Sequence, residues 1–256
     1  MPERITEDPS ACAPRRLFLV GTDTDCGKTA VTCALLRSAA AAGLAAIPFK
    51  PAASGPAGTG SDPARLLRAA GLPDDALAMI AMIAPLRYEP PLAPGVADDR
   101  DRFLLDSPPP PSRRPLELAR AALARAERRY RPAVTLIEGA GGLHVPMPGG
   151  TWLPEWITAL AATPVIVGRL GLGTINHTLL TIDALRQRGL TPAGFLLSRT
   201  RPAEDDRSCE DNPTIITRAR GLPCLGVLPY TPEDAPAPRD WHHPELWPRL
   251  MAPRTA

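Results

Sequence analysis

The feature that most constrains the fold of this chain is an apolar run that leads through a glycine-bounded loop into a helix-forming segment. Residues 16–21 (RLFLVG) are almost entirely apolar, which is typical of a strand buried on both faces of a parallel sheet. The segment from Gly27 to about Gly43 is rich in alanine and leucine and ends in glycine, so it predicts a helix. This order predicts the first unit of an α/β fold, with the loop at the ligand-binding edge of the sheet.

The loop, within VGTDTDCGKTA at residues 20–30, ends in Gly-Lys-Thr as phosphate-binding loops do. The usual pattern is G-x4-GK[ST], whereas here Thr22 stands at the first glycine and Gly21 gives G-x5-GKT. Between a buried strand and a helix, the backbone amides of residues 24–29 are expected to surround phosphate oxygens. Lys28 would neutralise the phosphates, and the Thr29 hydroxyl would contact Mg²⁺.

Lysine usage singles out the same loop. The chain has 29 lysine and arginine residues, of which only Lys28 and Lys50 are lysine, so 29 − 2 = 27 are arginine. The planar arginine fork does not replace a compact ammonium group that must fit among phosphate oxygens. We therefore interpret Lys28 as functional. For Lys50 the count alone is also compatible with a lysine that is present by chance in a chain with a strong arginine bias.

Bulk composition excludes several classes of protein. With 256 residues, 44% hydrophobic residues and a net charge of +2, the chain fits one globular domain and gives no electrostatic case for nucleic-acid binding. No apolar run approaches the roughly 18–20 residues of a membrane span, and residues 1–15 lack the apolar core of a secretory signal. The five cysteines are odd in number and show no C-x2-C pair, which favours a reducing cytoplasm.

Strand and helix patterns alternate along the rest of the chain. Further strands are predicted at 45–50, 133–139, 163–169, 193–198 and 224–229, and helices at 61–71, 116–130, 153–161 and 174–189. The proline-dense segment 85–115 is predicted to be a long surface loop. The pattern predicts a single-domain, P-loop NTPase-like α/β fold, with a mostly parallel sheet of about six or seven strands and helices on both faces. The domain would span 16–230, with a flexible tail at 1–15 and a tail of uncertain structure at 231–256.

Three stretches are expected to meet at the carboxyl edge of this sheet: the loop after the first strand, FKPAASG after the second, and EGAGG after the strand at 133–139. Glu138 ends an apolar strand at this edge, where it would be a partner of Mg²⁺ or an ordinary solvated acid. Asp62 stands in the first turn of a predicted helix. From local sequence alone, its favourable interaction with the helix dipole explains it slightly better than metal binding.

Six motifs in this order and spacing resemble the dethiobiotin synthetase family over residues 17–230: GTDTDCGKT, FKPAASG, SD at 61–62, PLAP at 91–94, EGAGGLHVP and LGTINHTLLT. The resemblance implies that the long loop spacing is the family's own variant. It also implies an enzyme that uses ATP, Mg²⁺ and CO₂ to convert 7,8-diaminopelargonic acid into dethiobiotin in biotin biosynthesis. The reaction would pass through a carbamate and a carbamic-phosphoric anhydride.

The resemblance also implies roles for individual residues and a homodimer with the substrate site at its interface. The implied catalytic residues are Lys50, Lys28, Thr24 and Ser54, and the implied metal ligands are Thr29, Asp62 and Glu138. Substrate binding is implied for Thr24, Lys50, Ser54, Gly142 and Asn176, of which Asn176 would act across the interface. Nucleotide binding is implied for Thr22, Asp23, Thr24, Asp25, Cys26, Gly27, Lys28, Thr29, Asp62, Ser198, Pro229 and Tyr230.

A departure from the family pattern concerns recognition of the nucleotide base. Ser198 stands where the family usually has an asparagine that reads the adenine edge, and a hydroxyl is too short to pair with two edge atoms. We therefore expect weak discrimination between ATP and other nucleotides, with Pro229 and Tyr230 packing against the base.

Three alternative functions remain open from the sequence. A paralogue that binds nucleotide without catalysis is suggested by Ser198. A cobyrinate-type amidoligase shares the loop but usually adds a glutaminase domain, for which the chain is too short. A partitioning-type ATPase would carry a second lysine where this chain has Asp23.

Overall fold

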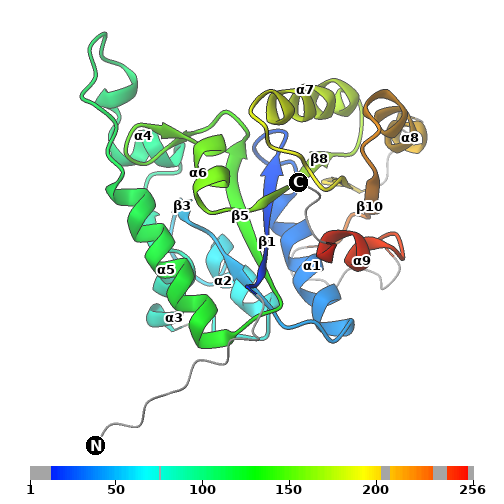
Figure 1. Ribbon diagram of the computed structural model, residues 1–256, viewed down its shortest axis with the longest axis horizontal. Helices are drawn as coiled ribbons and strands as arrows, with labels where there is room; N and C mark the ends of the chain where they lie inside the picture. The colour runs from blue at the N-terminus through cyan, green and yellow to red at the C-terminus, as the bar shows by residue number, and fades with distance from the viewer. Residues whose placement is uncertain (1–12, 75, 203–207, 233–240, 253–256) are drawn as a thin grey trace, which may run out of the picture.

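Six parallel strands form the central sheet of the computed structural model, which describes residues 13–74, 76–202, 208–232 and 241–252 (Figure 1). Strand β1 (Arg15–Gly21) lies inside the sheet, between β8 (Thr163–Arg169) and β5 (Val134–Gly142). The complete order is β10-β9-β8-β1-β5-β2, with β2 (Ala46–Phe49), β9 (Phe195–Ser198) and β10 (Cys224–Leu228). The predicted parallel sheet is confirmed, and its strands lie where the sequence predicts them.

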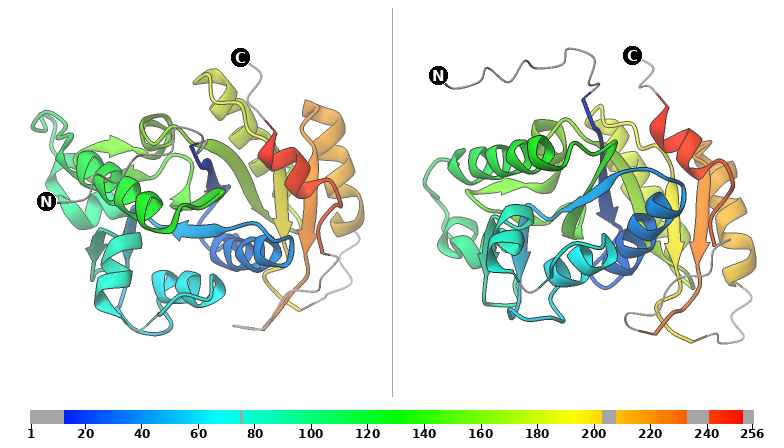
Figure 2. Two further views of the ribbon diagram at one scale, coloured as in Figure 1. Left: turned by 60° about the horizontal axis from the view of Figure 1, so that its bottom comes forward. Right: turned by 90° about the horizontal axis from the view of Figure 1, so that it is seen from below.

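Both faces of the sheet are apolar, because successive residues of a strand point to opposite sides. Leu17 and Leu19 belong to one core cluster, whereas Phe18 and Val20 belong to the other. The first face packs against α1 (Lys28–Ala41), α2 (Asp62–Ala69), α3 (Leu77–Ile83) and α9 (Leu246–Met251). The second packs against α5 (Arg114–Tyr130), α6 (Leu153–Ala159), α7 (Thr174–Gln187) and α8 (Ser208–Arg220). The predicted arrangement with helices on both faces is thus confirmed (Figure 2).

The proline-dense segment is not the continuous loop that its composition predicts. It contains β4 (Leu86–Tyr88), α4 (Pro94–Asp98) and a 3-10 helix, η1 (Asp101–Phe103). Pro94 stands in the first turn of α4, where a missing amide costs no helical hydrogen bond. Strand β4 pairs with β3 (Ala52–Ser54) in a small parallel sheet of its own, and β6 (Pro146–Met147) pairs with β7 (Thr151–Trp152) in an antiparallel one.

The C-terminal segment, whose structure the sequence leaves uncertain, packs against the domain. Trp241, Leu246, Trp247 and Leu250 are buried in the first core cluster. His242 forms an antiparallel bridge with Gly226 of β10, and the backbone amide of the following His243 donates a 3.0 Å hydrogen bond to a carbonyl of the same strand. His242 and His243 therefore cover part of the outer edge of β10.

Most of the predicted N-terminal tail, residues 1–12, lies outside the described residues, and β1 begins at Arg15. Within the described ranges, no helix combines the length and apolar character needed to cross a bilayer. The cysteines in those ranges, Cys26, Cys33, Cys209 and Cys224, are free thiols.

Candidate active site

The loop between β1 and α1 bends around the beginning of the helix. Asp25 and Gly27 adopt left-handed backbone conformations, with φ angles of 54° and 92°. Because Gly27 directly precedes α1, the amides of the first helical turn follow the bend and have no acceptor within the helix. A loop of this kind before a helix N-terminus provides donors and a positive dipole end for phosphate groups.

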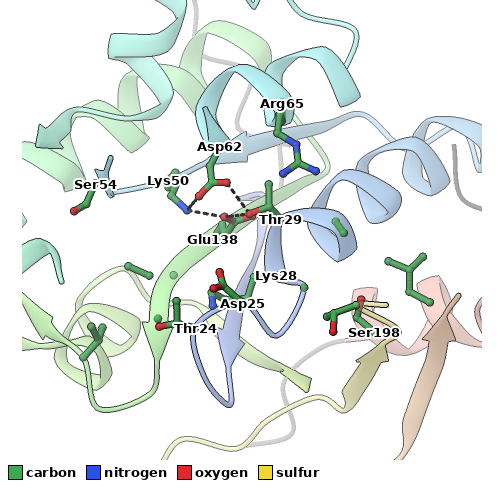
Figure 3. Close-up of a pocket in the computed structure, with 18 of the residues that line it drawn as sticks. Thr24, Asp25, Lys28, Thr29, Lys50, Ser54, Asp62, Arg65, Glu138 and Ser198 are labelled. Carbon is green, nitrogen blue, oxygen red and sulfur yellow. Dashed lines mark hydrogen bonds and ion pairs between the residues drawn. The ribbon is translucent and has the colours of Figure 1, made fainter. Parts of the chain in front are cut away.

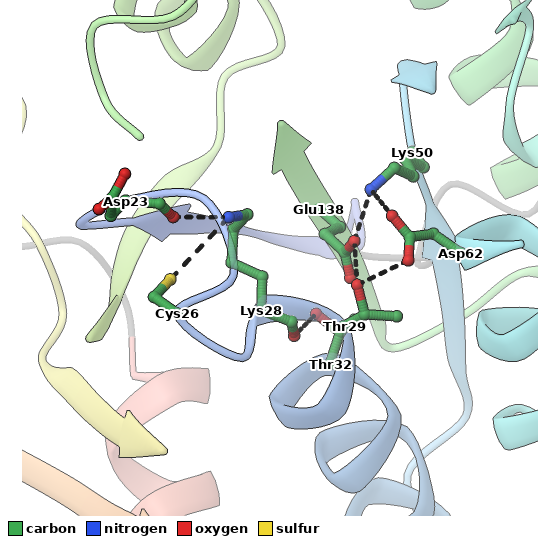
Figure 4. A network of polar contacts seen from close by, with 8 residues as sticks. All are labelled: Asp23, Cys26, Lys28, Thr29, Thr32, Lys50, Asp62 and Glu138. Atoms are coloured by element: carbon green, nitrogen blue, oxygen red, sulfur yellow. Dashed lines mark hydrogen bonds and ion pairs between the residues drawn. The ribbon is translucent and has the colours of Figure 1, made fainter. Parts of the chain in front are cut away.

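Lys28 folds back over the same loop (Figure 4). Its Nζ donates a 3.0 Å hydrogen bond to the carbonyl of Asp23 and lies 3.9 Å from the Cys26 sulfur. A Cβ on Gly21 would lie only 2.7 Å from this Nζ, so glycine at the end of β1 makes room for the ammonium. No carboxylate of the described residues pairs with Lys28, which leaves its charge available for phosphate oxygens.

Four side chains from separate elements meet beside the loop (Figures 3 and 4). The Nζ of Lys50, directly after β2, lies 2.7 Å from Asp62 Oδ2 and 2.6 Å from Glu138 Oε1. The Thr29 hydroxyl lies 3.0 Å from the other Asp62 oxygen and 3.0 Å from the same Glu138 oxygen. The structure thus brings the second lysine together with the three expected metal ligands.

Opposite charges outweigh burial in setting the charge states of this cluster. Glu138 is fully buried and Lys50 is 4% exposed. Burial alone lowers the pKa of Lys50, but the negative charges of Glu138 and Asp62 outweigh it and hold the pKa above its usual value. Burial raises the pKa of Asp62, but the charge of Lys50 and its hydrogen bond lower the pKa by a larger amount. The pKa of Asp62 therefore lies below its usual value. Both groups are therefore charged at neutral pH.

The cluster lines a cavity of about 730 Å³, a size suited to a small-molecule site. Figure 3 shows Ser54 and Thr24 toward one end and Ser198 at the other, with Lys28 and Thr29 between them. Pro229 and Tyr230 line the cavity as well, as does the segment 91–94. The expected nucleotide and substrate residues of these segments therefore face one space.

Several other expected site residues do not line this cavity. Thr22, Asp23 and Cys26 instead border a separate cavity of about 30 Å³. Gly142 packs against the loop, since a Cβ there would lie 3.4 Å from the Thr22 carbonyl. Asn176 is exposed on α7 and is absent from the cavity lining within a single chain.

The cluster offers a fit for Mg²⁺. Within the described residues, no group of three or more His, Cys, Asp or Glu side chains could hold a metal by itself. However, the second oxygen of Glu138 is buried without a hydrogen-bond partner, and the Thr29 hydroxyl adds an oxygen between the two carboxylates. In nucleotide sites Mg²⁺ usually takes few oxygen ligands from the protein, and phosphate oxygens and water supply the others.

Sequence reasoning missed Arg65, which lines the cavity from α2. Its spacing of three residues from Asp62 on a predicted helix was the available signal, because such pairs share a helix face. Arg199, Thr200 and Thr231 also line the cavity beside the expected Ser198 and Tyr230. No local pattern distinguishes them from ordinary loop residues.

Comparisons with known proteins show the family of this chain. The model of the AAA domain family matches residues 15–237. The ATP-dependent dethiobiotin synthetase BioD of Anaeromyxobacter sp. strain K is 42% identical over 225 residues, which cover 86% of this chain and 92% of that protein. The enzyme of the same name from Thermodesulfovibrio yellowstonii is 32% identical over 227 residues, covering 84% and 89%.

Solved structures support the fold alone. The signal recognition particle receptor FtsY of Elizabethkingia anophelis is 12% identical, with a TM-score of 0.51 over 96% of this chain and 68% of that one. Chloroplast FtsY of Physcomitrella patens gives a TM-score of 0.50 at 16% identity, covering 93% and 65%. From the sequence matches, the chain belongs to the AAA domain family and, within it, to the dethiobiotin synthetases.

Proposed function

We propose that this chain is an ATP- and Mg²⁺-dependent dethiobiotin synthetase that acts in biotin biosynthesis in the cytoplasm. The observation that carries the proposal is the contact of Lys50 with Asp62 and Glu138 in the same cavity as the Lys28 loop. A loop of this type alone would suit any nucleotide-hydrolysing enzyme. A second buried ammonium beside it suits a reaction in which an anionic substrate, rather than water, attacks the phosphate.

The proposed reaction has three bond-forming steps. An amine of 7,8-diaminopelargonic acid adds to CO₂, giving a carbamate and releasing a proton. A carbamate oxygen attacks the γ-phosphorus of ATP, and ADP leaves. The second amine then attacks the carbamate carbon, inorganic phosphate leaves, and the cyclic urea of dethiobiotin closes.

The side chains divide this work by position. Lys28 and the loop amides hold the phosphates, and Lys50 orients the carbamate toward the transferring phosphoryl group. Ser54 and Thr24 line the same cavity, and the Ser54 hydroxyl oxygen is buried without a hydrogen-bond partner in the described part of the chain. These hydroxyl groups would bind the carbamate and the substrate amines.

Thr29, Asp62 and Glu138 would hold Mg²⁺, which supplies charge neutralisation at the phosphates when bound. Before the metal–nucleotide complex enters, the positive charge of Lys50 offsets the repulsion between the carboxylates of Asp62 and Glu138.

The substrate site would be completed by a second copy of the chain. Asn176 lies on the exposed side of α7, and Leu172 and Leu180 beside it are 84% and 60% exposed. Leu180 lies on α7 and Leu172 in the turn just before it, and exposed apolar side chains that gather at one place on the surface are typical of an interaction surface. A homodimer through α7 would cover them and bring Asn176 to the partner's substrate carboxylate.

The decisive experiment supplies purified protein with ATP, Mg²⁺, labelled bicarbonate and 7,8-diaminopelargonic acid. We expect label in acid-stable dethiobiotin, with about one ATP consumed per product. Incorporation of label that depends on the diamine would distinguish synthesis from ATP hydrolysis without product formation. Nucleotide binding without any incorporation would reject the proposal in favour of a non-catalytic paralogue.

A further inference from the structure

We infer that Arg65 is a further phosphate-binding residue of this site, whose guanidinium contacts the terminal phosphate of the bound nucleoside triphosphate. The inference rests on the proposed function for the nucleotide but not for the diamine. Arg65 belongs to none of the motifs discussed above, and its role follows from its place on α2.

The position of Arg65 is fixed by the helix that carries Asp62. Arg65 stands three positions after Asp62, so the two side chains leave the same face of α2. Both line the 730 Å³ cavity together with Lys28 and Thr29. Figure 3 shows the Arg65 side chain extending from α2 toward Thr29, on the side of Asp62 away from Lys50. A nucleotide held by the loop would have its terminal phosphates at Thr29, within this part of the cavity.

The charges already present in the cavity leave room for another cation. The Lys50 ammonium is compensated by two carboxylates, at 2.7 and 2.6 Å. Asp62 in turn uses one oxygen for Lys50 and the other for the Thr29 hydroxyl. The cluster of Lys50, Asp62 and Glu138 therefore carries one net negative charge, so it contributes no positive charge toward a triphosphate, which brings several negative charges. The positive charge of Arg65 also helps to hold the pKa of Asp62 low, which agrees with the position of Arg65 close to that carboxylate.

The chemistry of the guanidinium suits this place. Its planar fork can bind two phosphate oxygens at once, which a single ammonium cannot do. Cations aimed at the terminal phosphate also stabilise the charge that develops during phosphoryl transfer. Because Arg65 lies on the Thr29 side of Asp62, it would distinguish a triphosphate from a diphosphate.

The test compares two arginines on one helix. Arg68 stands one turn after Arg65, outside the cavity lining, and donates hydrogen bonds to Asp74 and to the Thr59 carbonyl at 3.0 Å. Dissociation constants for Mg²⁺ complexes of a non-hydrolysable ATP analogue and of ADP are measured by calorimetry. We expect Arg65→Met to weaken analogue binding at least about tenfold and ADP binding less than about twofold, and Arg68→Met to change neither.

Arg65→Lys should recover part of the lost analogue affinity, since it keeps the charge but not the fork. Equal losses for ATP analogue and ADP, or no loss, would overturn the inference. If Arg65→Met does not fold, Arg65→Gln and Arg65→Lys carry the same comparison, with folding followed by circular dichroism. The diamine is absent from these measurements. Wild-type protein that binds the analogue through Arg65 but makes no dethiobiotin would therefore reject only the proposed function.

Discussion

Lys50 occupies a place that suits an ammonium group and not a guanidinium. Its charge is compact, nearly buried and shared between two carboxylates, one of which is itself fully buried. A planar guanidinium needs more space and directs its donors along fixed lines. In a chain with 27 arginines, this geometry gives a physical reason for one of the two lysines.

We expect Lys50→Arg to bind ATP within about threefold of the wild type but to form dethiobiotin at least about 100-fold more slowly, because a displaced charge misaligns the reacting groups. Steady-state product formation and calorimetric ATP binding, measured on the same preparation, test both parts. Near-normal product formation would show that the compact ammonium is not required.

Ser198 predicts an unusual tolerance for the nucleotide base. It is 2% exposed, and a Cβ on Gly27 would lie 2.4 Å from its hydroxyl oxygen, so the serine fills the space directly against the loop. A hydroxyl in this place lacks the paired donor and acceptor that an amide offers to a base edge. We expect turnover with CTP or GTP within about tenfold of that with ATP, since no paired contact rejects them. A strict preference for ATP in parallel assays would contradict this.

At the residue scale, the sequence could place Lys50 and Glu138 at the cavity because each stands at or near the end of a predicted strand, and Lys28 because it follows the loop after the first strand. Asp62 was harder, since an acid in a first helical turn has an ordinary explanation. Only the distances of both its oxygens to Lys50 and Thr29 separate the two interpretations. The spacing of Arg65 from Asp62 predicts only a shared helix face, because the place of Arg65 in the cavity depends on where α2 lies relative to α1.

Among the elements, those formed by local pattern were predictable and those formed by distant pairing were not. The six central strands carry their own apolar runs. In contrast, β3 is three residues long and exists through its pairing with β4, across the intervening α2 and α3. Helix α3 has the sequence LAMIAMI, in which an apolar run without polar alternation gives no period that distinguishes helix from strand.

Helix α7 carries the prediction for assembly. We expect Leu180→Arg to convert a homodimer into a monomer, because a charge replaces an apolar side chain that the partner would cover. Sedimentation velocity gives the oligomeric state. The monomer should bind ATP within about twofold of the wild type but have a KM for the diamine at least about tenfold higher, because Asn176 would no longer reach the partner's site.

Leu118→Arg is the matched control, since Leu118 is 51% exposed on α5, a different helix. A wild-type protein that sediments as a monomer would remove the dimer from the proposal without affecting the nucleotide site.

For the whole molecule, the C-terminal segment is a test of how far the folded domain extends. Leu250 is fully buried, whereas Leu118 is half exposed, so the same substitution can be compared at both sites. We expect Leu250→Ala to lower the free energy of unfolding by about 2–5 kcal/mol and Leu118→Ala by less than about 0.5 kcal/mol. Denaturant unfolding measures both. Equal effects would mean that residues 241–252 contribute little to the core.

The sequence could not predict this packing, because the segment is short and proline-rich and has no regular apolar period. The buried Trp247 gains a hydrogen-bond partner from α1. Trp247 Nε1 and His242 Nε2 lie 3.0 and 2.8 Å from the hydroxyl of Ser38, far away in the sequence.

The return of the chain along β10 also protects the molecule against uncontrolled strand addition. An open edge strand offers free amides and carbonyls to any other extended chain, which is a common route to aggregation. Here His242 and His243 occupy that position at one edge, and β2 at the opposite edge carries Pro48, which has no amide to donate. Loss of residues 241–252 would therefore do more than weaken the core, since it would leave the edge of β10 open to pairing with strands of other molecules.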